Sequence, residues 1–143
     1  PVRRVMIPKP DGSQRPLGIP CVKDRIVQMA TKIAIEPVFE ADFKDCSYGF
    51  RPKRSAKQAL EVVRKACNNK GYYVVDADIE KFFDNVNQDK LMALMELRIS
   101  DRRIQKLIRQ WLKSGILNGN ILEISELGTS QGSVISPLLA LNH

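Results

Sequence analysis

The chain has 143 residues, of which 43% are hydrophobic, so it can bury one core and is either one domain or part of a larger one. Its formal net charge is +7, and the excess lies in residues 1–70, which hold 15 Lys and Arg against 7 Asp and Glu, whereas residues 71–143 hold 8 against 9. A basic half beside a near-neutral half with clustered carboxylates suggests a polyanion partner, although a solvated, solubilising surface would have the same composition.

Cysteine and histidine usage argues against a zinc site. Cys21, Cys46 and Cys67 are odd in number and lack the spacing of metal ligands, and the single histidine is His143. The simplest interpretation is that the three cysteines are small buried thiols in a reducing compartment, which predicts a cytoplasmic protein. We find no signal-peptide pattern and no apolar run of membrane-spanning length, so no membrane partner is expected. Both ends of the sequence look cut.

The first predicted element is a β-hairpin. Residues 2–7 alternate in side-chain character, and residues 15–19 form a second strand. Asp11-Gly12 between them is a strong turn signal. Lys9 and Arg15 flank the predicted tip, where Arg would suit bidentate phosphate contact and Lys a point-charge contact. A solvated basic turn is the plainer alternative.

Two helices are predicted in the remainder of the basic half. Asp24 is the expected N-cap of the first, which ends near Pro37, and Ser55 with Gln58 forms a capping box at the start of the second. The apolar residues at helical spacing are expected to be buried: Ile26, Met29, Ala30, Ile33 and Ala34 in the first helix, and Ala56, Ala59, Leu60, Val63 and Cys67 in the second.

The second half contains shorter elements. A strand is predicted from Tyr72 to Asp78 because the run is apolar and rich in β-branched residues. After it we expect a helix that begins at Asn87 or Asp89 and bears Leu91, Leu94 and Met95, and then a helix capped by Asp101 and closed by Gly115. A hairpin around Asn118-Gly119 and a loop over residues 128–132 follow. Val134 to Leu141 is expected to be the opening of a buried helix.

The end of the predicted strand is the strongest candidate site. Asp76 and Asp78 are two residues apart, so on a strand they share a face, and a carboxylate at a strand end in a basic protein suggests a magnesium site that handles phosphates. The alternatives are that Asp76 faces solvent and that Asp84 caps the following turn. Phe83 could test a bound sugar by its bulk, although it and Phe82 could equally be core residues.

The loop over residues 128–132 has a Gly-x-x-x-Gly pattern. Two glycines let a backbone approach a ligand closely, and Gln131 could donate or accept hydrogen bonds to a base or sugar. The pattern is no more specific than other loops of this kind, and it is not a Walker P-loop.

These pieces occur in an order that resembles the reverse transcriptase, or maturase, encoded by group II introns. The resemblance spans nearly the whole chain. Four ordered blocks carry it: Ile7-Pro8-Lys9-Pro10-Asp11-Gly12 with Arg15-Pro16-Leu17-Gly18-Ile19-Pro20, then Tyr48-Gly49-Phe50-Arg51-Pro52, then Asp78-Ile79-Glu80-Lys81-Phe82-Phe83-Asp84, then Gln131-Gly132-Ser133 with Ser136-Pro137-Leu138-Leu139-Ala140.

The resemblance implies an α+β fold: the fingers of a right-hand polymerase in residues 1–70 and the first half of its palm in residues 71–143, with a small antiparallel sheet packed with helices. It implies Mg²⁺ as cofactor and a dNTP, an intron RNA template and a DNA primer as partners. The implied roles are catalytic metal ligand for Asp78, backbone-carbonyl metal ligand for Ile79, and nucleotide binding for Lys9, Arg15, Phe83, Gln131 and Gly132.

The sequence departs from this family in one important respect. The second palm motif, Tyr-x-Asp-Asp, is expected downstream of the helix that begins near Ser133, and the chain stops at His143 before it. We therefore expect weak metal binding and no polymerisation from these residues alone.

Two other readings remain open. The basic half could act as an RNA-binding module that assists splicing without catalysis, with nucleic-acid contacts from Arg3, Arg4, Arg51 and Arg54. The chain could also be an inert fragment, in which case apolar surface around Val134, Leu138 and Leu141 is expected to drive self-association.

Overall fold

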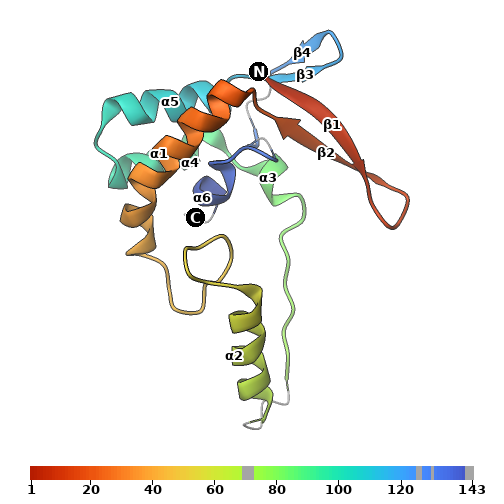
Figure 1. The fold of residues 1–143 in the computed structure, drawn as a ribbon, viewed down its shortest axis with the longest axis vertical. Coiled ribbons are helices and arrows are strands. Elements are labelled where there is room, and N and C mark those ends of the chain that lie inside the picture. Colours follow the sequence, from red (N-terminus) through yellow and green to blue (C-terminus); the bar gives the residue numbers. More distant parts are fainter. Residues whose placement is uncertain (69–72, 125–126, 130, 141–143) are drawn as a thin grey trace.

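The computed structural model of the protein describes residues 1–68, 73–124, 127–129 and 131–140 (Figure 1). A body of helices occupies its centre, and a long β-hairpin projects from it to one side. One helix lies apart from the body at the opposite end from the sheet. No helix in the described ranges is both long and apolar enough to cross a membrane.

The projecting hairpin confirms the first predicted element. Strand β1 (Val2–Pro8) pairs antiparallel with β2 (Gln14–Ile19), with Ile7 opposite Arg15. The backbone of Lys9 closes the loop, since its N–H donates to Ser13 O at 2.8 Å and its carbonyl accepts from Gly12 at 3.0 Å. Gly12 has a φ of +80°, which a glycine adopts without strain.

The sheet is mixed, which corrects the predicted antiparallel sheet. Strands β3 (Ile116–Asn118) and β4 (Ile121–Glu123) form the second predicted hairpin. The strand order is β2-β1-β3-β4, and β1 pairs parallel with β3. The parallel pair arises because the two hairpins come from distant parts of the sequence and meet edge to edge, so no turn dictates their direction.

The first helix, α1 (Val22–Glu40), begins three residues earlier than predicted. Cys21 is its N-cap, and its Sγ accepts from the backbone N–H of Asp24 at 3.5 Å and donates to the Asp24 carboxylate at 3.1 Å. The three cysteines, expected to be buried, are all exposed and free. Pro37 does not end the helix but lies within its last turn.

The buried face of α1 is also different from the predicted one. The predicted stripe is exposed, with Ile26 and Ile33 each 64% accessible, and the buried residues are instead Gln28, Thr31, Ile35 and Phe39. Two polar side chains can be buried here because both are hydrogen-bonded: Thr31 to Val27 O at 2.9 Å, and Gln28 to the C-terminal part of the chain.

The core lies where α1 packs on the helices of the second half. The predicted caps are confirmed, since the Asn87 side chain caps α4 (Gln88–Arg98) and the Asp101 side chain caps α5 (Arg102–Leu112). The core comprises Ile35, Phe39, Val86, Leu91, Met92, Met95, Ile99, Ile108, Ile135, Leu138 and Leu139, the last two from α6 (Ser136–Ala140). Leu94, predicted on the same stripe as Leu91, is exposed.

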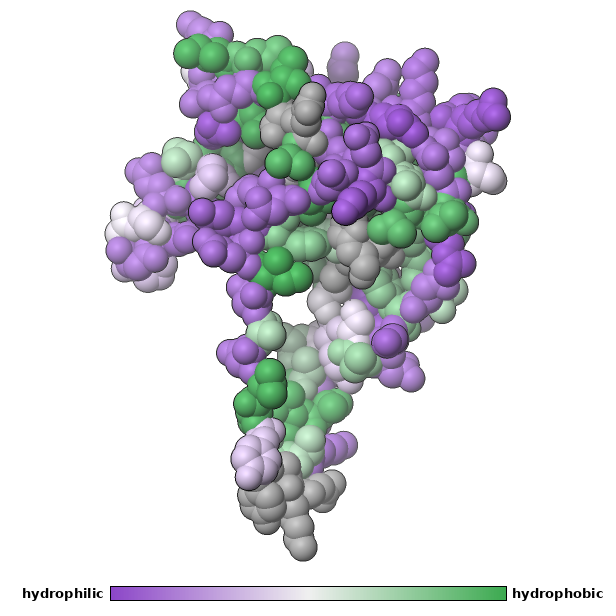
Figure 2. All heavy atoms as spheres, turned by 180° about the vertical axis from the view of Figure 1, so that it is seen from behind, coloured by the Kyte–Doolittle hydropathy of each residue, from purple (hydrophilic) through white to green (hydrophobic). Residues whose placement is uncertain are grey.

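The helix that lies apart is α2 (Ala56–Asn68). Its predicted capping box is confirmed, since the Ser55 N–H donates to Gln58 Oε1 at 2.8 Å and the Gln58 N–H to Ser55 Oγ at 3.4 Å. No residue of α2 is buried, so its predicted apolar stripe faces outward. In Figure 2, hydrophobic surface covers the end of the molecule that α2 and residues 73–79 form together, where Val74 and Val75 are also exposed, and a second hydrophobic area lies over the β3–β4 hairpin.

Residues 73–79 form an extended connection between α2 and α3 (Phe82–Asn85), not the predicted strand. Tyr72, where that strand was to begin, is outside the described residues. A strand needs a partner for its backbone N–H and C=O groups, and the described residues place none beside this run.

The predicted division near residue 70 falls within the gap at residues 69–72. The sheet takes β1 and β2 from one predicted half and β3 and β4 from the other, and α1 shares its core with α4, α5 and α6. The two-part division stays a prediction.

Candidate nucleotide-binding site

The glycine-rich loop, residues 127–133, is docked by its backbone onto two separate segments, residues 83–86 and strand β2. Ser130 lies outside the described residues. The Gly128 N–H donates to Val86 O, the Thr129 N–H donates to Phe83 O, and the carbonyl of Gln131 accepts from the Gly18 N–H, each at 2.7 Å. The loop therefore joins the short helix α3, with its C-cap Val86, to the outer edge of β2.

Arg15 and Gln131, separated by 116 positions in sequence, meet side chain to side chain. The Nε of Arg15 donates to Gln131 Oε1 at 3.0 Å, and both side chains lie near the surface. Both residues were predicted to bind the incoming nucleotide, one from the basic hairpin and one from the loop. The structure brings these two predicted residues together.

Gly132 packs directly against β2. Its φ is +104°, and a Cβ added there would lie 2.9 Å from Leu17 Cγ and 3.0 Å from Gly18 O. Glycine is thus required both by its backbone conformation and by the space that β2 leaves.

Phe83, the predicted aromatic gate, is held next to the same loop. It is half-buried, its ring meets that of Phe82 edge to face with centroids 5.8 Å apart, and its carbonyl accepts the Thr129 N–H. Phe82 packs against the core. The gate residue is therefore anchored to the loop by its backbone and to the core through its neighbour.

Lys9 lies at the tip of the β1–β2 hairpin, beyond the paired residues of the two strands. Its side chain is exposed, and its ammonium has no hydrogen-bond or ion-pair partner within the described ranges. Its role in nucleotide binding stays a prediction.

Asp78, the predicted catalytic carboxylate, is exposed on the extended segment before α3. It has no hydrogen-bond or ion-pair partner among the residues that the structure describes, and no contact there joins it to Arg15 or Gln131. Ile79 is 68% exposed, and Asp76 is exposed as well. The geometry leaves the Asp78 carboxylate accessible but does not test its catalytic role.

The magnesium prediction has partial support from chemistry alone. The resemblance to reverse transcriptases is what predicts a divalent metal ion here. The exposed Asp78 carboxylate and the backbone carbonyl of Ile79 are hard oxygen donors of the kind that Mg²⁺ takes together with substrate phosphates. Within the described ranges, no three His, Cys, Asp or Glu side chains cluster as a metal site. The residues present therefore fit half of a magnesium site rather than a complete one.

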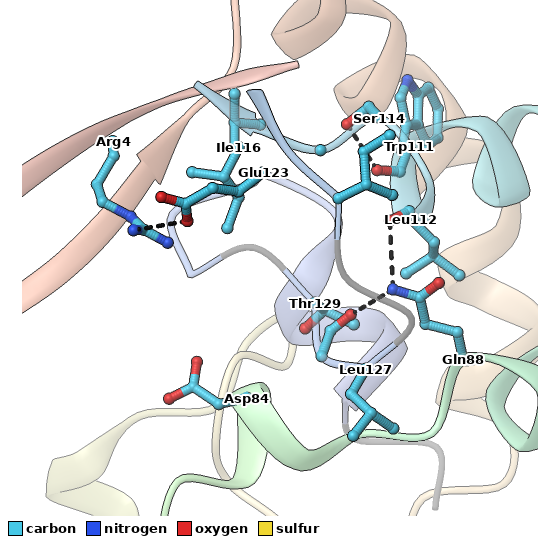
Figure 3. Close-up of a pocket in the computed structure, with 14 residues that line it drawn as sticks. Arg4, Asp84, Gln88, Trp111, Leu112, Ser114, Ile116, Glu123, Leu127 and Thr129 are labelled. Atoms are coloured by element: carbon cyan, nitrogen blue, oxygen red, sulfur yellow. Dashed lines mark hydrogen bonds and ion pairs between the residues drawn. The ribbon is translucent and has the colours of Figure 1, made fainter. Parts of the chain in front are cut away.

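Asp84 faces a cavity of about 350 Å³ below the β3–β4 hairpin (Figure 3). Across that space, Arg4 forms an ion pair with Glu123 at 2.9 Å, and the Gln88 amide donates to Gly128 O and Leu112 O. Asp84 is exposed and lies within α3, and the helix that follows it, α4, is capped by Asn87 instead.

The four arginines predicted to contact nucleic acid have different surroundings. Arg3 is exposed, Arg4 is paired with Glu123, and Arg54 lies half-exposed against Asp45 and the ring of Tyr48. Arg51 is buried and makes hydrogen bonds to Glu40 and to the carbonyls of residues 44 and 47. Its geometry argues against the predicted nucleic-acid contact, because its donors are already used within the protein.

The Arg51–Glu40 pair has the electrostatics of a structural contact. The hydrogen bonds from Arg51 lower the pKa of Glu40, and the same bonds raise the pKa of Arg51. Its guanidinium also lies 5.0 Å from the ring centroid of Phe43. Both groups stay charged near neutral pH, so this contact fixes residues 40–51 between α1 and α2.

Two buried glutamines at the loop were missed by the sequence reading. Gln88 binds one end of the loop through Gly128 O at 3.0 Å, and Gln28 binds the other end through Ser133 and Val134. A glutamine within an apolar helical run, such as Val27-Gln28-Met29, was the signal available for Gln28, but its partner lies 105 residues away in sequence.

The structure thus brings together Arg15 of the basic hairpin and Gln131 of the glycine-rich loop, and it ties Phe83 to the same loop. The chain belongs to the reverse transcriptase family: the sequence model described as "Reverse transcriptase (RNA-dependent DNA polymerase)" matches residues 7–142. The α+β fold of polymerase fingers and palm is confirmed, with the correction to the sheet given above.

Named relatives support the resemblance to group II intron proteins. "Protein YkfC" of Escherichia coli (strain K12) is 42% identical over 98% of this chain and 38% of its own length. "Group II intron-encoded protein LtrA" of Lactococcus lactis subsp. cremoris is 39% identical over 98% of this chain and 23% of its own length. The chain thus spans well under half the length of these relatives.

A solved structure agrees with the fold. A chain of the "Partial Cas6-RT-Cas1--Cas2 complex" superposes with a TM-score of 0.61 and 28% identity over 99% of this chain and 24% of that chain. The predicted family resemblance is confirmed.

Proposed function

We propose that this chain carries the incoming-nucleotide site of an RNA-directed DNA polymerase encoded by a group II intron. The observation that supports this most directly is the Arg15–Gln131 hydrogen bond, which joins the basic hairpin to the glycine-rich loop next to Phe83. Family membership supports the reaction class, template-directed nucleotidyl transfer.

Each residue has a role that its position allows. Arg15 presents a planar guanidinium to the triphosphate, and Lys9 at the hairpin tip adds a mobile charge. The Phe83 ring limits the space beside the sugar. Its position is fixed because the Phe83 carbonyl accepts a hydrogen bond from the Thr129 N–H. Positioning and charge neutralisation provide most of the rate in phosphoryl transfer, so a site that fixes these groups is well suited to it.

Asp78 supplies one carboxylate of the metal site, and Ile79 its neighbouring carbonyl. Bound Mg²⁺ would supply activation of the primer 3′-hydroxyl and stabilisation of the leaving pyrophosphate. One carboxylate without the Tyr-x-Asp-Asp aspartates is an incomplete set of ligands. Residues 1–143 are therefore expected to bind nucleotide weakly and not to extend a primer.

The first test is a nucleotide-binding titration. A fluorescent dNTP with Mg²⁺ is titrated with the chain, with Arg15→Ala and with Arg64→Ala, a matched variant on α2 whose arginine pairs with Glu61. Loss of a charge-assisted hydrogen bond worth about 1.5–3 kcal/mol predicts roughly 10- to 100-fold weaker binding for Arg15→Ala alone. Equal affinity of all three proteins would refute the site.

The second test is primer extension. Residues 1–143 are incubated with an RNA template, a DNA primer, dNTPs and Mg²⁺, and no extension is expected. Extension that is lost in Asp78→Ala would show that the catalytic set is complete in this chain, contrary to the proposal.

A second function, RNA binding that assists splicing, is favoured by the exposed cations of the basic half. We propose that Arg3 is the clearest of these, because Arg4 is engaged by Glu123. If the chain binds RNA through phosphates, each phosphate contact should lower the affinity by about 0.7–0.9 log units for every tenfold rise in salt concentration. Charge reversal at Arg3 and Arg54 should weaken RNA binding, whereas Asp78→Ala should leave it intact; unchanged affinity after both reversals would exclude this function.

A further inference from the structure

We propose that Gln28 is a positioning residue for the nucleotide site, acting through the glycine-rich loop; this rests on the function proposed above. Gln28 is 2% exposed and lies on α1, which contains none of the residues assigned to the site. Its Oε1 accepts from Ser133 Oγ at 2.7 Å and from the Val134 N–H at 3.1 Å.

Burial makes these two hydrogen bonds decisive for the local geometry. Ser133 is 6% exposed. A buried donor that loses its acceptor cannot replace it with bulk water, so Ser133 and Val134 are held where the Gln28 oxygen is. The same amide fixes the residues that lead into α6.

A continuous set of contacts leads from Ser133 to Arg15. Gly132 precedes Ser133 and fits against Leu17 and Gly18 with no space for a Cβ. Gln131 then bonds Gly18 through its backbone and Arg15 through its side chain. A displacement at Ser133 is therefore transmitted to the Gln131 amide that orients the Arg15 guanidinium.

The other end of the loop is held independently. Gln88 binds Gly128 O, and the Thr129 N–H binds Phe83 O. Neither contact involves α1. Loss of the Gln28 amide should thus release the Gln131 end of the loop and leave the Phe83 end in place, which a general loss of stability would not do.

Amide hydrogen exchange of the 143-residue chain, measured by NMR, tests the positioning directly. In Gln28→Leu we expect the Gly18 amide, whose acceptor is Gln131 O, to exchange at least 10-fold faster, and the Thr129 amide to change less than 2-fold. Gln28→Glu keeps an oxygen acceptor at the same place and should restore protection at Gly18.

The matched control is Gln105→Leu, which also removes a glutamine hydrogen bond, in this case to Ile99 O at 2.7 Å, away from the loop. An unchanged Gly18 amide in Gln28→Leu, or equal acceleration at Gly18 and Thr129, would overturn the proposal. If Gln28→Leu does not fold, Ser133→Ala, which removes one of the two donors and little volume, carries the same expectation at Gly18 with a smaller acceleration.

Nucleotide affinity separates this inference from the proposed function. With fluorescent dNTP and Mg²⁺ as the probe, Gln28→Leu should weaken binding several-fold while its affinity for a generic RNA is unchanged, and Gln28→Glu should recover most of the loss. If the unaltered chain binds no dNTP, the proposed function fails, and the exchange of the Gly18 amide still decides whether Gln28 positions the loop.

Discussion

At the scale of single residues, Arg51 was predicted to contact nucleic acid at the surface, but its side chain is buried. Its block in the sequence resembles a reverse transcriptase motif, and its side chain points inward. Only 5% of that side chain is exposed, and its donors reach Glu40, Lys44 O and Ser47 O. The residue joins the end of α1 to the loop before α2.

Replacement of Arg51 by Lys is expected to lower the melting temperature more than replacement of Arg54 by Lys. One ammonium cannot reproduce the fork of donors that Arg51 uses, whereas Arg54 makes two longer contacts to Asp45 at 3.2 and 3.4 Å near the surface. Thermal unfolding followed by circular dichroism measures both variants. Equal shifts would mean that Arg51 contributes no more than a surface ion pair.

The lowered pKa of Asp101 predicts that the folded protein loses stability in acid. The hydrogen bonds from Arg103 lower the pKa of Asp101 from 3.8 to about 2. A carboxyl whose pKa is lower in the folded state stabilises the protein above its unfolded pKa, and that contribution is lost as the pH falls from about 3.8 towards 2.

The check is to compare the chain with Asp101→Asn in melts from pH 6 to pH 2. Asn remains a good N-cap but does not titrate, so the stability difference between the two proteins should shrink below pH 4. A difference that is constant over this range would contradict the assignment.

At the scale of elements, the glycine-rich loop is docked by backbone hydrogen bonds as well as by the glutamine side chains described above. Gly18, Thr129 and Gly128 each use a backbone N–H to join elements that are distant in sequence. The segment over residues 73–79 shows the converse: strong strand propensity did not produce a strand, because no partner edge faces it in the described structure.

Gly132→Ala should disrupt the docking of the loop on β2, and Gly12→Ala is its matched control. Both glycines have positive φ, so each substitution costs about 1–2 kcal/mol in backbone strain. Gly12 has nothing within 4 Å of an added Cβ, whereas at Gly132 the Cβ would meet Leu17 and the Gly18 carbonyl. Urea unfolding should therefore show a larger loss for Gly132→Ala; an equal loss would show that the loop can move away from β2.

At the scale of the whole molecule, the exposed apolar surface is not where it was predicted. Leu138 is buried at 3%, so the predicted association surface around it is wrong, Val134 is only partly exposed, and Leu141 lies outside the described residues. Exposed apolar side chains lie instead on α2, which packs none of them into the core: Leu60, Val62 and Val63.

We still expect the chain to self-associate, now through α2. Leu60→Glu with Val63→Glu should lower the apparent mass at high protein concentration in sedimentation velocity, because like charges would replace the apolar stripe. Lys65→Glu changes the net charge by the same two units on the other side of α2 and should have little effect. A monomeric chain at all concentrations would dismiss the prediction.

The sequence by itself determined the local structure and the family. The β1–β2 hairpin, the Ser55–Gln58 capping box and the caps at Asn87 and Asp101 were all predictable, because a turn or cap is decided by residues within a few positions of one another. The ordered motifs gave the same family as the match over residues 7–142.

Only the tertiary structure decided which surfaces meet. The exposed stripe of α1, the parallel pairing of β1 with β3 and the inward turn of Arg51 depend on partners that lie far away in sequence. Gln28 is the clearest case, since an amide in an apolar run is buried where Ser133 and Val134 donate hydrogen bonds to its oxygen. Burial and strand pairing depend on two segments that meet in space, so the residue pattern of one segment does not reveal which segment it will contact.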